Sequence, residues 1–325
     1  MNNTSITAVP GIRVGHYTDL DNATGCTVIL CEGGAVGGVD VRGSAPGTRE
    51  TDLLDPMAWV SDVHGILLSG GSAFGLNATA GVMEYLEERR VGIDLNGTVI
   101  PIVPAAILFD LKLVTDSVRP GSKEGKAACL DASDAPVKEG SVGAGTGATV
   151  AKLLGKEKSI KGGIGSESID LGGGLMVGAI VAVNAVGDVA DPETGEILAG
   201  PRGTESGDMI DSMRLLMSPD FSELTEMLPT NTTIGVVATN ANLTKPQVNK
   251  LASVAHDGLA ASIRPAHLMV DGDTMFALST GTLDNVDADM NRLCASITYC
   301  VSKAIIRGIQ NAHGIGGVPS ISELH

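Results

Sequence analysis

The sequence has few aromatic residues: four Phe, three Tyr and one Trp among 325 positions. Sites that stack nucleobases or sugars depend on aromatic rings, so this scarcity argues against a protein that binds single-stranded nucleic acid. The hydrophobic content of 43% excludes a disordered chain. Together with 43 glycines, it predicts a core of Val, Ile, Leu and Ala in which backbones approach closely.

Positive charge is also scarce. The 22 Lys and Arg face 38 Asp and Glu, which gives a formal net charge of −16. No basic stretch could release counterions from phosphates, so neither nucleic acid nor anionic lipid is an expected partner. The longest apolar run, 175–183, is too short to span a bilayer, and the N-terminus does not have the pattern of a signal peptide. We therefore expect a cytoplasmic protein without membrane contact.

Cysteine and histidine patterns typical of metal sites are missing. The five cysteines form no C-x-x-C motif, and an odd number of buried thiols suits a reducing compartment. The six histidines occur singly, without the H-x-x-x-H or H-E-x-x-H spacing of zinc sites. A Ser–His–Asp triad stays open, although no G-x-S-x-G elbow supports one. We expect neither a metal ion nor a cofactor.

The chain has no repeat of fixed period and no low-complexity linker, so we expect a single domain over residues 1–325. Apolar strand-like runs and helical patterns follow one another, which favours a layered α/β or α+β sandwich. The expected strands are 27–30, 65–68, 99–103, 175–183, 234–238 and 275–278, and the expected helices are 76–90, 245–263 and 287–311. Thr244 is the expected N-cap of the second helix.

Two glycine-rich segments could bind an anion. Residues 69–75, SGGSAFG, lie between an expected strand and an expected helix, where backbone N–H groups can hold an oxyanion or a carboxylate. Close packing of strand against helix explains the same residues equally well. We keep Ser69, Gly70 and Gly71 as candidate pocket residues. Residues 143–152, GAGTGATVAK, match the dinucleotide fingerprint only superficially, because no apolar strand precedes them.

A polar Asn-Thr-Thr at 231–233 directly precedes the expected strand 234–238. A threonine hydroxyl needs a base to become a nucleophile, and an α-amine, which titrates near about pH 8, can supply one. That requires cleavage before Thr232. The Thr232 hydroxyl would attack the Asn231 carbonyl in an N-to-O acyl shift, and water would then release a chain that begins with Thr232. A turn that enters a strand is the ordinary alternative for these residues.

Asp271 and Asp273 flank a glycine just before the expected strand 275–278. Two neighbouring carboxylates can orient a hydroxyl and an ammonium, and their repulsion can raise one pKa. Asp-Gly-Asp is also a common turn sequence. The remaining positions of a calcium loop are missing, so we do not expect calcium.

Taken in order, these segments resemble the DmpA-like, or S58, self-processing peptidases. The family includes L-aminopeptidase/D-esterases, β-peptidyl aminopeptidases and 6-aminohexanoate-oligomer (nylon oligomer) endo-hydrolases. The similar segments are collinear and cover most of the chain: 9–19, 39–54, 68–76, 143–152, 183–189, 231–244 and 267–281. Such an ordered set is more specific than any single motif.

The resemblance implies a four-layer αββα sandwich that is cut into residues 1–231 and 232–325, with Thr232 as the nucleophile. Asn184 corresponds to the family's oxyanion-stabilising asparagine. Asp271 and Asp273 correspond to the pair that orients the nucleophile and its new amine. Aspartates at both positions favour the oligomer-hydrolase branch, since the aminopeptidases carry a serine and a glutamate there.

Two further positions bear on the implied site. Lys152 corresponds to a catalytic lysine of the oligomer-hydrolase branch, although an exposed lysine that begins a helix is the ordinary alternative. Phe109 stands where several relatives have a tyrosine that contacts the reacting group, so one hydroxyl donor is missing and Phe109 becomes a candidate pocket residue.

The implied activity is hydrolysis of small peptides or linear amide oligomers through a Thr232 acyl-enzyme, in a homo-oligomer that we expect to be a tetramer. Two alternatives stay open. One is acyl transfer to an amine, as in ornithine acetyltransferases, which also mature at a threonine. The other is an uncleaved binding or scaffold protein, which the change at Phe109 would suit.

Overall fold

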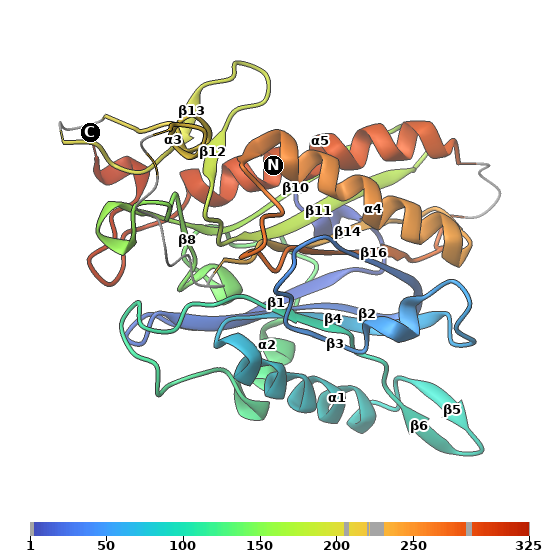
Figure 1. Ribbon diagram of the computed structural model, residues 1–325. Helices are drawn as coiled ribbons and strands as arrows, with labels where there is room; N and C mark the ends of the chain where they lie inside the picture. The colour runs from blue at the N-terminus through green and yellow to red at the C-terminus, as the bar shows by residue number, and fades with distance from the viewer. Residues whose placement is uncertain (1–2, 205–207, 220, 222–230, 284–287, 325) are drawn as a thin grey trace.

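The structure is a computed structural model of the whole chain, and it describes residues 3–204, 208–219, 221, 231–283 and 288–324. Two layers of β-strands are stacked face to face, and a pair of helices covers each outer side (Figure 1). One pair is α4 (Lys245–Ser262) with α5 (Met290–Gln310), and the other is α1 (Ala78–Glu88) with α2 (Ser122–Asp131). The expected four-layer αββα sandwich is confirmed.

One hydrogen-bonded sheet supplies both inner layers. Its strands are β1 (Arg13–Asp19), β2 (Thr24–Val41), β3 (Thr48–Arg49), β4 (Asp62–Ser69), β7 (Ala105–Ile107), β10 (Gly163–Asp170), β11 (Met176–Val183), β14 (Ile234–Thr239) and β16 (Thr274–Ser279). Their order is β10-β11-β14-β16-β2-β4-β7-β3, and β1 pairs with β2. The neighbours β14 and β16 are parallel. This parallel pair carries the polar segments singled out above.

The long strand β2 connects the two layers. Its first part pairs with β1 and β4, and its last part pairs with β16. The register with β4 shifts between Leu30 and Ala35, where Gly34 has a φ of +81°. Such an irregularity bends a strand, so the sheet folds over and encloses a core between its own layers.

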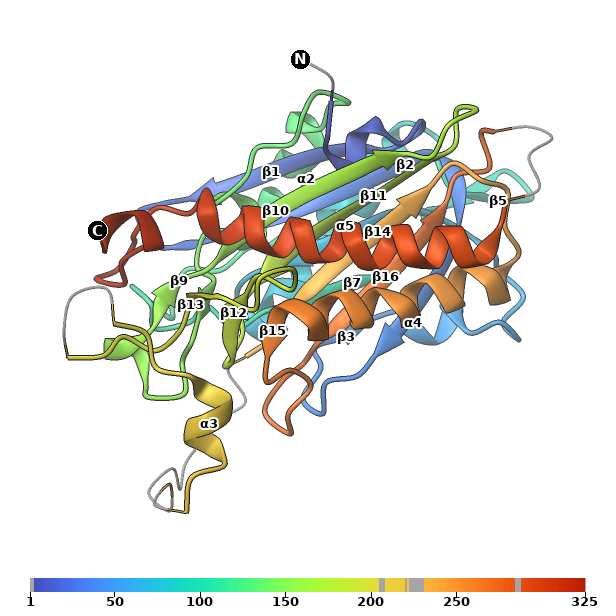
Figure 2. The same ribbon diagram turned by 90° about the horizontal axis from the view of Figure 1, so that it is seen from above.

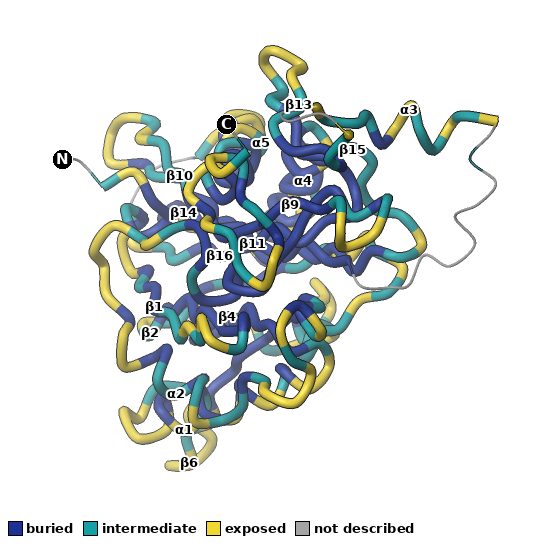
Figure 3. Tube along the Cα trace, turned by 90° about the vertical axis from the view of Figure 1, so that its left-hand side faces the viewer, coloured by how far each residue is buried: buried dark blue, intermediate teal, exposed yellow. Residues whose placement is uncertain are grey.

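Three hydrophobic cores separate the four layers, and residues alternate between them along each strand. In β11, Val181 and Val183 face α4 and α5, whereas Ile180 and Ala182 face the other strand layer. In β4, Leu67 packs toward α1 and α2, while its neighbours on either side point to the middle core. Figure 3 shows the buried residues concentrated in the strand layers, and Figure 2 shows α4 and α5 side by side across β11, β14 and β16.

The three expected helices are present with slightly different ends. Helix α1 begins two residues late, after a 3₁₀ helix over Ser72–Asn77, and α4 begins at Lys245 as expected. Thr244 is the N-cap of α4, where its backbone N–H donates to Gln247 Oε1 at 2.8 Å. Helix α5 runs over Met290–Gln310, and Asp287, where we expected it to begin, lies outside the described residues.

Four expected strands lie within β2, β4, β14 and β16, and the fifth, 175–183, begins one residue before β11. The expected strand 99–103 is wrong in its second half. Strand β6 ends at Ile100, because Pro101 has no N–H to donate to a ladder. Helix α2 was not expected because its sequence, SKEGKAACLD, has few apolar residues. The remaining short elements are β5 (Ile93–Leu95), β6 (Thr98–Ile100), β8 (Thr149–Val150), β9 (Ile160–Lys161), β12 (Asp188–Ala190), β13 (Ile197–Ala199), β15 (Ile263–Arg264) and α3 (Ser212–Leu216).

In the part of the chain that the structure describes, none of the helices is both long enough and apolar enough for a bilayer crossing.

Glycines allow helices to pack backbone against backbone, as the composition predicted. A Cβ at Gly81 of α1 would overlap the carbonyl oxygen of Ser122, and one at Gly125 of α2 would overlap that of Ala78. The same happens between β10 and α5, where a Cβ at Gly165 would overlap the Ala304 carbonyl oxygen. Backbone atoms cannot move aside as a side-chain end can, so these positions admit only glycine.

Gly81→Ala should lower the free energy of unfolding by about 1–3 kcal/mol, because the added methyl forces α1 away from α2. Gly33→Ala is the matched control, since a Cβ at Gly33 meets nothing within 4 Å. Urea unfolding of the two variants measures the difference. Equal stability of both variants would contradict the close packing of α1 on α2.

Candidate functional site

The segments that precede β14 and β16 lie side by side. Because these strands are parallel neighbours, their N-terminal ends meet at one edge of the sheet. Asn231 forms a parallel bridge with Asp271, and the Thr274 N–H donates to the Thr233 carbonyl at 3.1 Å. The Asn-Thr-Thr and Asp-Gly-Asp segments, 40 residues apart in the sequence, therefore face each other.

Thr232 is 5% exposed at this edge. Its Oγ1 donates to the carbonyl oxygen of Asn231 at 2.5 Å, and its N–H donates to the carbonyl oxygen of Asn184 at 2.7 Å. The Asn231 carbonyl oxygen also accepts the Gly272 N–H at 2.9 Å. The carbonyl oxygen of the peptide bond between Asn231 and Thr232 thus accepts two hydrogen bonds, one from the Thr232 hydroxyl and one from the Gly272 N–H.

Gly272 leaves room for the Thr232 hydroxyl. A Cβ at Gly272 would lie 2.8 Å from Thr232 Oγ1 and 2.6 Å from the carbonyl oxygen of Ala45. The chain just after β2 holds the same turn from the other side, because the Ala45 N–H donates to the Asp271 carbonyl at 2.8 Å and the Gly43 N–H donates to the Asp273 carbonyl at 3.2 Å. The turn is fixed by backbone on both sides, and any side chain at Gly272 would displace the hydroxyl.

One oxygen of each carboxylate is held by the loop before the turn. Asp271 Oδ2 accepts the Leu268 N–H at 2.8 Å, and Asp273 Oδ2 accepts His267 Nδ1 at 2.8 Å. The other oxygens differ. Asp273 Oδ1 accepts the Thr233 N–H at 2.8 Å, whereas Asp271 Oδ1 is buried and has no hydrogen-bond partner within the described residues.

Burial brings an acid and a base of the site to similar proton affinities. Burial, followed by the nearby charge of Asp273, raises the pKa of Asp271 to about 7. Burial lowers the pKa of Lys152 to about 7, although the negative charges of Asp271 and Asp273 act in the opposite direction. Titratable groups whose pKa values are shifted toward neutral pH are typical of functional sites.

Asn184 links the lysine to the turn. Its Oδ1 accepts Lys152 Nζ at 2.9 Å and the Thr149 N–H at 3.1 Å, while its side-chain amide nitrogen donates to the Phe109 carbonyl at 3.3 Å. Its backbone oxygen accepts the Thr232 N–H. The structure therefore brings together Thr232, Asp271, Asp273, Asn184 and Lys152, with Phe109 at their border. Lys152 follows the short strand β8 instead of beginning a helix, so the ordinary alternative for this residue is wrong.

The glycine turn after β4 lies against a different carboxylate. The Gly71 N–H donates to Asp110 Oδ1 at 2.7 Å, the Gly70 N–H donates to the Gly25 carbonyl at 2.8 Å, and Ser69 Oγ donates to the Gly70 carbonyl at 3.0 Å. Burial raises the pKa of Asp110 to about 6. These donors are used inside the protein, so a role of Ser69, Gly70 and Gly71 in a substrate pocket stays a prediction.

His267 is the site residue that sequence reasoning missed as a functional candidate. It donates to Asp273 through both its ring and its backbone. A single histidine without a motif gives no signal by itself. Its position in HLMVDGD, just ahead of the two aspartates, was the only indication available.

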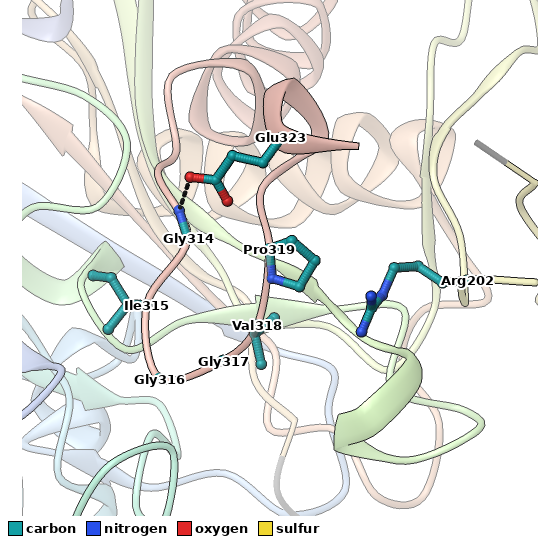
Figure 4. A pocket seen from close by; sticks show the side chains of 8 residues that line it. All are labelled: Arg202, Gly314, Ile315, Gly316, Gly317, Val318, Pro319 and Glu323. Atoms are coloured by element: carbon teal, nitrogen blue, oxygen red, sulfur yellow. Dashed lines mark hydrogen bonds between the residues drawn. The ribbon is translucent and has the colours of Figure 1, made fainter. Parts of the chain in front are cut away.

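A separate open groove of about 450 Å³ lies at the C-terminal loop (Figure 4). It is lined by Arg202, Gly314, Ile315, Gly316, Gly317, Val318, Pro319 and Glu323. Glu323 accepts the Gly314 N–H at 3.1 Å. These lining residues are all different from those around Thr232, so the groove is not the site described above.

Known proteins resemble the chain over nearly its whole length. Residues 4–321 match the model of peptidase family S58. An uncharacterized aminopeptidase of Mycobacterium leprae is 43% identical, over 97% of this chain and 92% of that protein. A 6-aminohexanoate-oligomer endohydrolase of Paenarthrobacter ureafaciens is 30% identical, over 85% of this chain and 74% of that protein.

Solved structures share the fold. One is the L-aminopeptidase D-Ala-esterase/amidase of Ochrobactrum anthropi, which is described as a prototype for the serine aminopeptidases and a new variant of the Ntn-hydrolase fold. It aligns with a TM-score of 0.71 at 19% identity, over 98% of this chain and 88% of its own chain. A β-aminopeptidase of Burkholderia sp. aligns with a TM-score of 0.66 at 21% identity, over 99% of this chain and 92% of its own chain. At such low sequence identities, the structural similarity supports a common fold and no more.

Lys152→Met should stabilise the protein in a pH-dependent way, measured in a Thr232→Ala background that has no hydroxyl beside the Asn231 carbonyl. The folded-state pKa of Lys152, about 7, lies below its usual 10.5, so burial of its ammonium costs stability, most at and below about pH 7. The gain in melting temperature from Lys152→Met should therefore be largest near about pH 6 and should shrink as the pH rises toward about 10. A gain that does not change with pH would contradict the burial of a charged lysine.

Proposed function

The chain belongs to peptidase family S58 and is an amide-bond hydrolase, and from this premise we propose that it cleaves itself between Asn231 and Thr232 and then uses Thr232 as its nucleophile. The observation that carries the proposal is the geometry at this peptide bond. Thr232 Oγ1 lies 2.5 Å from the Asn231 carbonyl oxygen, and that oxygen accepts the Gly272 N–H. The hydroxyl next to this carbonyl group and the backbone donor on its oxygen support an attack by Thr232 and stabilisation of the resulting oxyanion.

Self-cleavage begins with an N-to-O acyl shift. The Thr232 oxygen bonds to the Asn231 carbonyl carbon, the carbon–nitrogen bond breaks, and the hydroxyl proton passes to the leaving nitrogen. We assign the base to Asp271, because its Oδ1 is buried without a partner in the described residues and because Gly272 of the same turn leaves the space next to the hydroxyl open. Water then hydrolyses the ester, which leaves the Asn231 carboxylate and a free Thr232 amine.

The mature site acts on a substrate amide by the same chemistry. The new amine of Thr232 stays next to the Asn184 carbonyl oxygen, which accepts the Thr232 N–H before cleavage. The amine removes the hydroxyl proton, Thr232 Oγ1 attacks the substrate carbonyl, and the leaving amine departs with that proton. The Asn184 side-chain amide and the Gly272 N–H stabilise the oxyanion, and Lys152 fixes Asn184 through its Oδ1. Water releases the acyl group.

Small peptides and linear amide oligomers are the proposed substrates. The relatives named above are aminopeptidases and an oligomer endohydrolase, and two carboxylates beside the nucleophile suit a substrate that carries an ammonium group. A screen of amino-acid amides, dipeptides, β-peptides and 6-aminohexanoate oligomers separates these classes. A homo-oligomer, with four copies expected, is part of the proposal, and light scattering measures it.

Thr232→Ala should leave an intact and inactive chain, because no hydroxyl remains to attack the Asn231 carbonyl. Thr232→Ser is the matched control: it keeps the hydroxyl and should still produce two fragments. Denaturing electrophoresis together with an amide-hydrolysis assay measures both properties. Cleavage and normal turnover in the Thr232→Ala variant would refute the assignment.

Self-cleavage should slow as the pH falls below about 7. The pKa of Asp271 is about 7, so its carboxylate takes up a proton below this pH and can no longer accept the hydroxyl proton. The rate should decrease about tenfold for each pH unit between about 7 and 5. Asp271→Asn should cleave at least about a hundredfold more slowly than the native chain at pH 8. Fast cleavage by this variant would remove Asp271 from the role of base.

A further inference from the structure

His267 makes two hydrogen bonds to one oxygen of Asp273. Its ring Nδ1 lies 2.8 Å from Asp273 Oδ2, and its backbone N–H donates to the same oxygen at 3.1 Å. The His267 side chain is 19% exposed and the Asp273 side chain is 4% exposed. Because little water reaches this contact, the donors of His267 control how the carboxylate is oriented.

The backbone of His267 adopts an uncommon conformation that makes this double contact possible. Its φ is +59°, in the left-handed region that only a few per cent of residues other than glycine occupy, with histidine, asparagine and aspartate the most frequent among them. This conformation directs the backbone N–H and the ring of one residue to the same carboxylate. Strained residues of this kind persist where the surrounding structure requires them, often at functional sites.

The other oxygen of Asp273 faces the strand that carries the nucleophile. Oδ1 accepts the Thr233 N–H at 2.8 Å, and Thr233 directly follows Thr232. A chain of contacts therefore runs from His267 through one carboxylate to the backbone of the nucleophile. Among the residues that the structure describes, Asp271 has no equivalent, since its Oδ2 accepts only the Leu268 N–H.

A second histidine, His256, packs against the His267 ring. His256 of α4 is fully buried, and its ring packs edge to face against that of His267, with 4.8 Å between the ring centroids. Burial lowers the pKa of His256 to about 4, so the ring is neutral at pH 7. Its Nε2 therefore donates to the Asp40 carbonyl at 2.9 Å, which fixes the wall against which the His267 ring rests.

We propose that His267 is a positioning residue: by holding Oδ2 of Asp273, it aims Oδ1 at the Thr233 N–H and so places the Thr232 hydroxyl for attack. The inference rests on the proposed function of Thr232 and adds a residue to that machinery. His267 does not touch the reacting atoms. Without its ring donor, Asp273 keeps only the backbone N–H on Oδ2 and can rotate away from Thr233.

Three substitutions separate the ring donor from the backbone conformation. His267→Gly keeps the left-handed backbone and removes the ring. His267→Asn tolerates the same backbone and carries an N–H close to the position of Nδ1. His267→Gln places its N–H one bond farther along the side chain. Circular dichroism and thermal melting of each variant in the Thr232→Ala background confirm that the chain folds.

The measurements are the rate of self-cleavage, followed by denaturing electrophoresis, and the kcat and KM of the matured protein on one amide substrate. His267→Gly and His267→Gln should lower the cleavage rate and kcat by about ten- to a hundredfold, with KM changed less than about twofold, because a misplaced nucleophile affects the reaction more than binding. His267→Asn should restore both rates to within about threefold of the native values.

The inference is overturned if His267→Gly cleaves and turns over like the native chain, or if a folded His267→Asn variant is as slow as His267→Gly. Either result would leave Thr232 as the nucleophile of a normally cleaved native protein. A native protein that is never cleaved before Thr232 would instead overturn the proposed function itself. The two failures are therefore distinguishable in the same set of gels.

Discussion

The parallel pairing of β14 with β16 is the constraint on which the site depends. Parallel neighbours begin at the same edge of a sheet, so the residues that precede them must meet whatever their separation in the sequence. The bridge between Asn231 and Asp271 continues this pairing for three residues beyond the strands. The position of Gly272 next to the Asn231 carbonyl, and the room that it leaves for the Thr232 hydroxyl, follow from this register.

The rest of the molecule buries this edge of the sheet and holds its strands in place. Strand β14 is buried along its whole length between two cores, and the end of β2 pairs with β16 from the other side. In such surroundings the charges of Asp271 and Lys152 are costly, and burial shifts the pKa values of these two groups toward one another. The backbone donors from Leu268, Thr233 and the chain after β2 offset part of this cost. These buried groups thus lower the stability of the protein, but they can take up or release a proton near neutral pH.

The sequence predicted much of this arrangement, for physical reasons that differ between elements. Alternating and continuous apolar runs identified β4, β11, β14 and β16, and helical periodicity identified α1, α4 and α5. Helix α2 was not predicted, because it contacts its neighbours through Gly125 and other small residues, and its sequence therefore has no apolar stripe. Ordered similarity to a known family, and not local pattern, grouped Thr232, Asn184, Lys152 and the two aspartates. His267 could not be assigned, because its role depends on a backbone conformation that no local rule predicts.

Intact-mass spectrometry of the purified native protein determines whether the chain is cut before Thr232. Self-cleavage gives two masses, those of residues 1–231 and 232–325, with threonine at the start of the smaller fragment. A single mass near 33.0 kDa after prolonged incubation at pH 7 to 8, in protein shown to be folded, would contradict it.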